Sequence, residues 1–261
     1  WFKENWQREK MVAAGLPDFG PVQNNISFND AIGTTRGIHA EPWDKFVSLG
    51  AGRIFGAWVD MREGPTFGAV FTAVLDPSKA IFVPRGVGNA YQTLEAGTVY
   101  AYLVNDHWSP DAAYSFLNLA DATVGIDWPI PLDGAELSEK DRTHPQLEDV
   151  IPIPPLKILV TGADGQVGRA LRAVYGESAH VEYTTRSTLD LANPGLATAR
   201  RWRDYGVIIN AAAYTAVDAA EAPSGRSLAW QVNAHGPAQL SRIAAEHGIT
   251  LVHVSSDYVF D

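Results

Sequence analysis

The chain of 261 residues contains no cysteine, which excludes disulfide frameworks, thiolate metal sites and cysteine nucleophiles. It also lacks an apolar run of the roughly 18–20 residues that a membrane span needs, and no basic-then-apolar signal segment opens it. Lys and Arg total 20 against 30 Asp and Glu, a formal net charge of -10 that disfavours non-specific binding to nucleic acid or anionic membranes. We therefore expect a cytoplasmic protein without nucleic-acid or membrane partners, whose anionic ligands meet a local basic cluster.

Two halves of the chain follow different patterns. Hydrophobic residues make up 46% of the sequence, which excludes a disordered or collagen-like chain. Between about residues 52 and 104, short β-type segments alternate with Pro and Gly, a pattern typical of a sandwich or small barrel. From Lys157 onward, apolar strands alternate with amphipathic helices, which predicts βαβ units and a parallel sheet.

A proline-rich stretch separates the halves. The sequence IPIPP at 151–155 favours an extended spacer, because proline fixes φ and has no N–H to donate. We predict a multidomain protein with an all-β unit over residues 1–145, a linker over 146–156 and an α/β unit over 157–261. Because the chain starts at Trp1 and stops in a strand-like context, we also expect that both ends are cut.

A glycine-rich turn opens the α/β half, where G-x-x-G-x-x-G lies between a predicted strand at 157–161 and a predicted helix at 166–175. Gly162 permits a tight turn, Gly165 lets backbone amides approach a pyrophosphate, and Gly168 lets helix and strand pack closely. The partial positive charge at the helix N-terminus would face the phosphates. Arg186 follows the next strand, where it is either a partner for the 2′-phosphate of NADPH or a solvated surface arginine.

Four blocks in this half carry a family resemblance: TGADGQVG at 161–168, VIINAAAYTAVDAAE at 207–221, VNA at 232–234 and VSSDYVFD at 254–261. The half resembles the extended short-chain dehydrogenase/reductase superfamily and, more closely, the dTDP-4-dehydrorhamnose reductase family. The resemblance implies NADPH or NADH bound by Gly162, Asp164, Gly165, Gln166, Val167, Gly168, Arg186, Ala211, Ala212 and Ala213. It also implies that the Ser256 hydroxyl polarises a substrate carbonyl. The family's Tyr-x-x-x-Lys pair falls beyond Asp261, so we expect this reductase half to be incomplete.

The segment RGIHAE at 36–41, followed by Lys45, contains the highest concentration of candidate catalytic side chains in the first half. His39 in a β-rich unit is compatible with a metal-binding cupin site or with a metal-free acid/base site. A metal cupin needs a second histidine from a later Pro-x-Gly-x-x-His element, but PRGVGN at 84–89 places Asn89 there. Since imidazole is the usual ligand for such metals, we favour the metal-free interpretation.

Several ordered blocks extend this interpretation: Phe2-x-Glu4, QNNIS at 23–27, RGIH at 36–39, VDMR at 59–62, PTFG at 65–68, GIDWP at 125–129 and LSEKD at 137–141. Together they resemble the dTDP-4-dehydrorhamnose 3,5-epimerase family of dimeric jelly-roll enzymes. The resemblance implies that His39 is the base, that Asp141 orients it and that Lys45 stabilises an enolate, roles that suit their chemistry. It further implies that Gln23, Asn25 and Arg36 hold the diphosphate or sugar, with Phe2 and Glu4 near the thymidine.

Three positions depart from the epimerase pattern. Ala40 and Glu41 stand where the family usually has Tyr or Gln, and Asn89 replaces a histidine. In YLVNDHWSP at 102–110, the tyrosine expected as proton donor aligns with Trp108, whose indole N–H cannot act as an acid. His107 is an alternative donor only if the backbone is irregular, because neighbouring strand residues point to opposite faces.

The two halves together predict a bifunctional enzyme of dTDP-L-rhamnose synthesis. It would epimerise dTDP-4-dehydro-6-deoxy-D-glucose at carbons 3 and 5 without a metal, then reduce the 4-keto group with NAD(P)H, and would dimerise through the jelly roll. One alternative is a nucleotide-sugar binding module with impaired epimerase activity. Another joins the first half to a different nucleotide-sugar dehydrogenase or epimerase domain.

Overall fold

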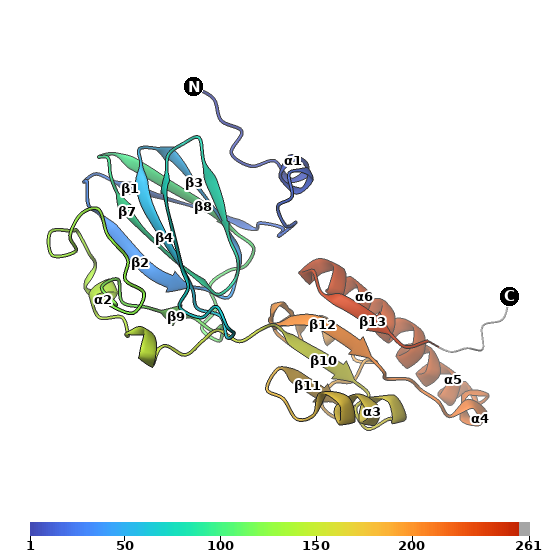
Figure 1. Cartoon of the computed structure of the whole chain (residues 1–261). Helices are drawn as coiled ribbons and strands as arrows, with labels where there is room; N and C mark the ends of the chain where they lie inside the picture. Colours follow the sequence, from blue (N-terminus) through green and yellow to red (C-terminus); the bar gives the residue numbers. More distant parts are fainter. Residues whose placement is uncertain (256–261) are drawn as a thin grey trace. The chain divides into compact units, whose positions relative to one another are not determined.

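The computed structural model describes residues 1–255 and divides into two units, Trp1–Pro154 and Pro155–Asp261 (Figure 1). The first unit contains helices α1 (Arg8–Ala13), α2 (Glu139–Arg142) and η1 (Leu147–Asp149), and strands β1 (Gln23–Asn29), β2 (Thr35–Ala40), β3 (Lys45–Ala51), β4 (Ile54–Asp60), β5 (Val70–Leu75), β6 (Ala80–Val83), β7 (Val87–Thr93), β8 (Thr98–Val104) and β9 (Ser115–Phe116). One sheet has the order β1-β8-β3-β6 and the other the order β5-β4-β7-β2-β9; we call them the β1 sheet and the β2 sheet. All of these pairings are antiparallel, which confirms the predicted jelly roll.

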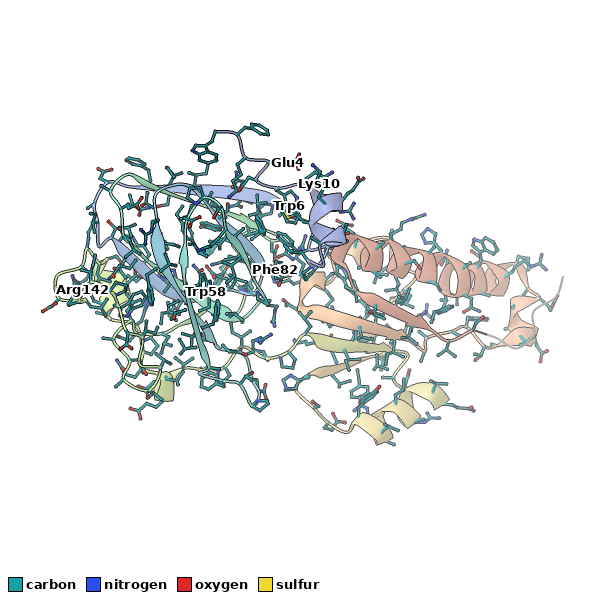
Figure 2. All side chains as sticks on the ribbon, turned by 45° about the horizontal axis from the view of Figure 1, so that its top comes forward. Glu4, Trp6, Lys10, Trp58, Phe82 and Arg142 are labelled. Atoms are coloured by element: carbon teal, nitrogen blue, oxygen red, sulfur yellow. The ribbon has the colours of Figure 1, made fainter. Side chains whose placement is uncertain are left out.

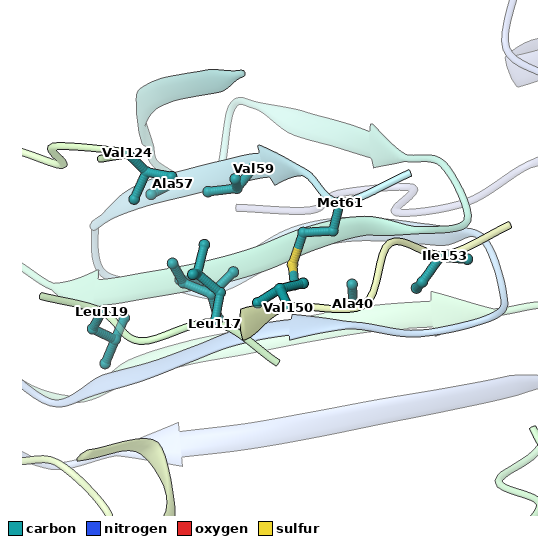
Figure 3. Close-up of a cluster of buried hydrophobic side chains, with 11 residues drawn as sticks. Ala40, Ala57, Val59, Met61, Leu117, Leu119, Val124, Val150 and Ile153 are labelled. Carbon is teal, nitrogen blue, oxygen red and sulfur yellow. The ribbon is translucent and has the colours of Figure 1, made fainter. Parts of the chain in front are cut away.

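Strand β4 shows how the sequence builds two cores from one strand. Because successive side chains point to opposite faces, Ala57 and Val59 enter one apolar cluster, whereas Ile54 and Trp58 enter another. The first cluster, with fully buried Ile38, lies between the β2 sheet and the later segments of the unit (Figure 3). The second joins β4 and β7 to β3 and β8, so it fills the space between the two sheets.

The N-terminal segment is anchored by aromatic side chains. The Trp6 ring lies 5.1 Å from the rings of both Phe19 and Phe46, and Phe19 packs edge-on against Phe82. Trp6 and Phe82 are labelled in Figure 2. These contacts fasten the residues around α1 to strands β3 and β6, since Phe46 and Phe82 belong to those strands.

Residues 146–154 differ from the extended spacer that the prolines favour. Val150 and Ile153 are 7% and 2% exposed and belong to the cluster of Ile38. The Ile153 N–H donates to the Met61 carbonyl, and Arg62 pairs with Ile153 in an isolated bridge. Proline limits backbone pairing here, but the apolar residues between the prolines still supply side chains that the core buries, so this segment is part of the first unit.

The second unit alternates strands and helices. It contains β10 (Lys157–Thr161), α3 (Gln166–Tyr175), β11 (Val181–Thr184), η2 (Leu196–Thr198), η3 (Trp202–Asp204), β12 (Tyr205–Asn210), α4 (Val217–Ala220), α5 (Pro223–Trp230), the π-helix η4 (Gln231–His235), α6 (Gly236–His247) and β13 (Thr250–His253). The strands pair in parallel in the order β11-β10-β12-β13, with α3 on one face and α5 and α6 on the other (Figure 1). This arrangement confirms the predicted partial Rossmann-type sheet.

Among residues 1–255, none of the helices combines the length and the apolar content that crossing a bilayer requires.

Candidate active site and cofactor site

His39 is presented by an irregular stretch of β2. The register between β2 and β7 shifts between Arg36 and His39, and Gly37 has a φ of 121°. A Cβ at Gly37 would lie 2.7 Å from the Asn89 carbonyl oxygen, so both the backbone angle and the space require glycine. Since Ile38 and Ala40 are buried in the cluster behind the β2 sheet, His39 between them points toward the β1 sheet.

Asp141 holds the His39 ring from the side of α2. Its Oδ1 lies 2.8 Å from His39 Nε2, while its backbone N–H donates to the Ser138 hydroxyl that caps the helix. Burial would raise the pKa of the Asp141 carboxyl, but the hydrogen bond and charge of His39 together hold it below its ordinary value. Because Nε2 is committed to Asp141, Nδ1 is the ring nitrogen that can accept a proton from a ligand.

Two adjoining cavities surround this dyad. The larger, of about 530 Å³, is lined by Gln23, Asn25, Arg36, His39, Glu41, Trp43, Tyr102, Val104, Asp106, Trp108, Tyr114, Phe116, Ser138, Lys140 and Asp141. The smaller, of about 220 Å³, is lined by Ser27, Arg36, His39, Glu41, Lys45, Asn89, Tyr91, Tyr100 and Tyr102. The structure therefore brings together seven residues that the sequence analysis singled out: His39, Asp141, Lys45, Gln23, Asn25, Arg36 and Asn89.

Lys45 is a buried cation on β3, only 5% exposed. Its Nζ lies 2.5 Å from Glu41 Oε2 and 5.5 Å from the centre of the Tyr102 ring. A buried ammonium group needs such a partner, and Glu41 supplies it from a position where the epimerase pattern usually has Tyr or Gln.

Tyr102 is the phenol that the sequence analysis missed. It lines both cavities with His39, so the assignment of the donor position to Trp108 does not leave the site without a phenolic proton. Burial, followed by the nearby Glu41 carboxylate, raises the pKa of Tyr102 and keeps it protonated. Tyr102 lies opposite Val47 in the pairing of β8 with β3, on the face that carries Lys45; this register is the signal that could have found it.

In the second unit, the glycine turn forms a cradle at the carboxyl end of β10. Gly162 has a φ of 67°, and a Cβ there would lie 2.7 Å from the Ala212 backbone. The N-terminus of α3 has no side-chain cap, which leaves its N–H groups for a ligand. A cavity of about 250 Å³ opens there, lined by Gly162, Asp164, Gly165, Arg186, Leu189, Asp190, Leu191, Ala211, Ala212, Ala213, Tyr214 and Val232. The residues fit a dinucleotide, because the turn admits a pyrophosphate close to the backbone.

Comparison with known proteins agrees with this architecture. Residues 1–149 match the family model described as dTDP-4-dehydrorhamnose 3,5-epimerase. The chain belongs to the dTDP-4-dehydrorhamnose 3,5-epimerase family. It is 51% identical over 162 residues to the RmlC homolog of Streptococcus pyogenes, covering 59% of this chain and 81% of that protein. It also resembles a solved structure of RmlC from Streptococcus suis in complex with dTDP-D-xylose, with 49% identity and a TM-score of 0.55, over 59% of this chain and 82% of that one.

The second unit matches a different family. Residues 156–261 match the model described as RmlD substrate binding domain. They are 44% identical over 106 residues to the dTDP-4-dehydrorhamnose reductase of Mycobacterium tuberculosis, covering 40% of this chain and 34% of that reductase. The epimerase-family unit is thus joined to a segment that spans about a third of such a reductase.

Other predicted residues of the epimerase-family unit lie at or beyond the rim. His107 Nδ1 lies 2.9 Å from Gln23 Oε1, and His107 is absent from the lining of both described cavities. Phe2 is 91% exposed. Glu4 pairs with Lys10 at 2.7 Å (Figure 2). Neither Phe2 nor Glu4 lines a described cavity within this chain. Their contact with thymidine stays a prediction.

Asn89 stands where the sequence analysis expected a histidine, and His144 is a histidine near His39 that it missed. Asn89 Oδ1 accepts from Trp58 Nε1 at 2.9 Å, and Asn89 Nδ2 donates to the Tyr100 hydroxyl, so this amide is committed to neighbouring side chains. His144, three residues after Asp141, packs its ring 5.4 Å from that of His39. Burial and the charge of His39 lower the pKa of His144. The Asp-x-x-His spacing is its one sequence signal.

The remaining predicted residues lie around the cradle. Gln166, Val167 and Gly168 form the first turn of α3 and do not line the described cavity. Arg186 does line it, is largely exposed and pairs with Asp190 at 3.7 Å, so both interpretations of this arginine stay open. Ser256 lies outside the described residues.

Proposed function

We propose that the first unit epimerises dTDP-4-dehydro-6-deoxy-D-glucose at carbons adjacent to its 4-keto group. The observation that carries this proposal is the hydrogen bond between His39 Nε2 and Asp141 Oδ1 beside cavities that also contain Lys45 and Tyr102. Membership of the epimerase family supports it, as does the dTDP-sugar in the related S. suis structure.

Proton removal begins the proposed reaction. His39 Nδ1 takes the proton from the carbon next to the ketone, and the electron pair of that C–H bond moves into an enolate whose negative charge lies on the keto oxygen. Asp141 stabilises the resulting imidazolium through Nε2, and the Lys45 ammonium group stabilises the enolate oxygen. Glu41 keeps Lys45 in place.

Tyr102 completes the inversion. His39 belongs to the β2 sheet, whereas Tyr102 belongs to the β1 sheet, and both line the same cavities. A sugar between them therefore meets the base on one face and the phenol on the other. Tyr102 donates its proton to the carbanion carbon, and the phenolate then regains a proton from water while the imidazolium releases one.

Substrate binding and assembly follow from the same unit. Arg36, Gln23 and Asn25 would hold the diphosphate or the sugar at the cavity wall. Strand β1 is an edge strand of its sheet, and its side chains Ile26 and Phe28 are each 67% exposed. We therefore propose a homodimer through the jelly-roll unit, in which these apolar side chains would be covered.

For the second unit, we propose binding of NADPH or NADH in a reductase of the same pathway. The Gly162 to Gly168 turn and the N-terminus of α3 would hold the pyrophosphate. The nicotinamide supplies a hydride when bound. Ser256 is proposed to hydrogen-bond the 4-keto oxygen.

Solvent isotope exchange tests the epimerase proposal. Incubation with the dTDP-4-keto sugar in deuterated water should place deuterium at carbon 3 or carbon 5, and His39→Asn should abolish that exchange. His180→Asn, at a partly exposed histidine of the second unit, is the matched control and should retain it. Absence of exchange with bound sugar would overturn the proposal and favour a nucleotide-sugar binding module.

A further inference from the structure

Three side chains of metal-binding type converge beside the larger cavity. His39 of β2, Asp141 of α2 and His144 just beyond α2 place one ligand atom each within 4.8 Å of one another. Asp141 Oδ1 lies 2.8 Å from His39 Nε2 and 3.9 Å from His144 Nε2. In a tetrahedral zinc site with bonds of about 2.0 Å, neighbouring ligand atoms are about 3.3 Å apart. The two distances from Asp141 Oδ1 lie on either side of that value, so side-chain adjustment would bring both histidines to the spacing of such a site.

His144 is the group that the proposed epimerase reaction leaves unexplained. It is 8% exposed, and within residues 1–255 neither of its ring nitrogens makes a hydrogen bond of normal geometry, although the Gly37 carbonyl faces the ring. A buried polar group without a well-formed hydrogen bond is energetically unfavourable. Phe116 stacks on the ring at 5.0 Å and fixes its orientation. The ring is thus held with Nε2 3.9 Å from Asp141 Oδ1, where a metal ion could join the two groups.

We propose that His39, Asp141 and His144 bind one divalent transition-metal ion of the zinc class, and that this ion inhibits the enzyme. The inhibitory part rests on the function proposed above. Two imidazoles and one carboxylate form a donor set that suits zinc or cobalt, and three protein ligands leave a fourth position open.

Inhibition follows from the chemistry of the His39 ring. A metal bound at Nε2 uses the lone pair of that nitrogen, so the single proton of the neutral ring lies on Nδ1. Nδ1 then cannot accept a proton from the sugar, and the Asp141 oxygen that orients the ring is also engaged. The metal and the proton-abstracting state are mutually exclusive.

Nearby charges limit the affinity. The Lys140 ammonium group lies 5.0 Å from the centre of the Phe116 ring and opposes a cation, as does Arg36 at the cavity wall. The Asp141 carboxylate supplies the negative charge within the cluster. We therefore expect reversible binding that a chelator removes, in contrast to a permanently occupied structural zinc site.

Cobalt is the probe, because its visible absorption reports coordination without substrate. Titration of the untagged full chain with Co²⁺ should saturate at one equivalent with a tetrahedral spectrum, and Zn²⁺ should displace the Co²⁺ while EDTA removes it. His144→Phe keeps the ring shape, should weaken binding at least tenfold and should retain deuterium exchange without metal. His180→Phe is the matched control and should bind as the unaltered chain does.

Either of two outcomes would overturn the proposed metal site. One is the absence of stoichiometric Co²⁺ binding, and the other is a folded His144→Phe variant that binds Co²⁺ as tightly as the unaltered chain. If circular dichroism shows that His144→Phe is unfolded, imidazole NMR signals of the unaltered chain decide: those of His39 and His144 must shift together on zinc addition. Metal binding without any isotope exchange would leave the site intact and remove the proposed epimerase function. Exchange that persists at saturating zinc would remove the inhibition.

Discussion

The two units build their sites in opposite ways. The cradle of the second unit is one local turn, in which glycines and the N-terminus of α3 act through the backbone. The site of the first unit is assembled from β2, β3, β8 and α2, and His39 and Asp141 are 102 positions apart. Side chains from facing sheets can reach both faces of a substrate, whereas a local turn can only hold a ligand against one sheet edge. The proton transfers proposed for the first unit therefore use facing side chains, whereas the cofactor binding proposed for the second uses the backbone of one turn.

Tyr102→Phe should have the largest effect on the inversion rate. The substitution removes the proposed proton donor on one face of the sugar and leaves the base on the other face. We expect inversion to fall by about 10²- to 10⁴-fold. Deuterium exchange with retained configuration should persist, since His39 can return a solvent-derived proton to the face from which it took one. NMR of the recovered sugar separates exchange from inversion.

Trp108→Phe is the matched control for the donor. Trp108 lines the larger cavity but is 72% exposed, and its indole is not an acid. This variant should invert the sugar at close to the original rate. Loss of inversion in Trp108→Phe with retention in Tyr102→Phe would contradict the assignment.

This contrast also explains what the sequence could predict. Gly162, Gly165 and Gly168 are close in sequence, and the strand and helix around them were predicted correctly because hydrophobic period and turn chemistry are local. His39 and Lys45 stood out by residue type, Asp141 and the three roles came from family resemblance, and the structure brings the three residues together. Tyr102 and His144 could not be placed, because one depends on the register between β3 and β8 and the other on the path of the chain after α2.

Residues 146–154 also show that local sequence features do not determine which side chains are buried. Proline content predicts an extended backbone, but it does not say whether Val150 and Ile153 are buried. Burial depends on a complementary apolar surface, here the outer face of the β2 sheet, and that surface is formed by residues distant in sequence. The prolines shape the segment, while the tertiary core decides where it lies.

Two glycine variants should separate packing from ligand approach in the second unit. A Cβ at Gly168 would collide with the Gly162 carbonyl oxygen and Ala163, so Gly168→Ala should lower the melting temperature of this unit and weaken dinucleotide binding more than tenfold. A Cβ at Gly165 would meet only the Gly162 oxygen, at 3.2 Å. Gly165→Ala should therefore preserve melting but weaken binding. Calorimetry and fluorescence titration measure the two effects, and equal losses of stability would refute this division.

Asp121 should stabilise the first unit through hydrogen bonds from backbone N–H groups. Its carboxylate accepts N–H groups from Leu147, Thr123 and Val124, and these bonds outweigh the effect of burial and lower its pKa. Asp121→Asn should cost about 1–3 kcal/mol of unfolding free energy at neutral pH. Because the folded pKa lies below the ordinary 3.8, this contribution is present above that pH and disappears as pH falls through the folded pKa. Urea unfolding across pH should show the difference between the two proteins shrinking in acid; a constant difference would argue against it.

Arg186→Ala should have the smallest effect and decides between the two interpretations of this side chain. The guanidinium is 66% exposed and already pairs with Asp190 at 3.7 Å, so a contact with a 2′-phosphate would be screened by solvent. If Arg186 binds that phosphate, NADPH affinity should fall by about two- to fivefold with NADH affinity unchanged, and salt should reduce the difference. Asp190→Asn is the matched variant, because it frees Arg186 from its partner and should strengthen NADPH binding slightly. An unchanged ratio of NADPH affinity to NADH affinity in Arg186→Ala would identify Arg186 as a surface arginine. Phosphate binding by the described residues 157–255 would then rest on the backbone of the glycine turn.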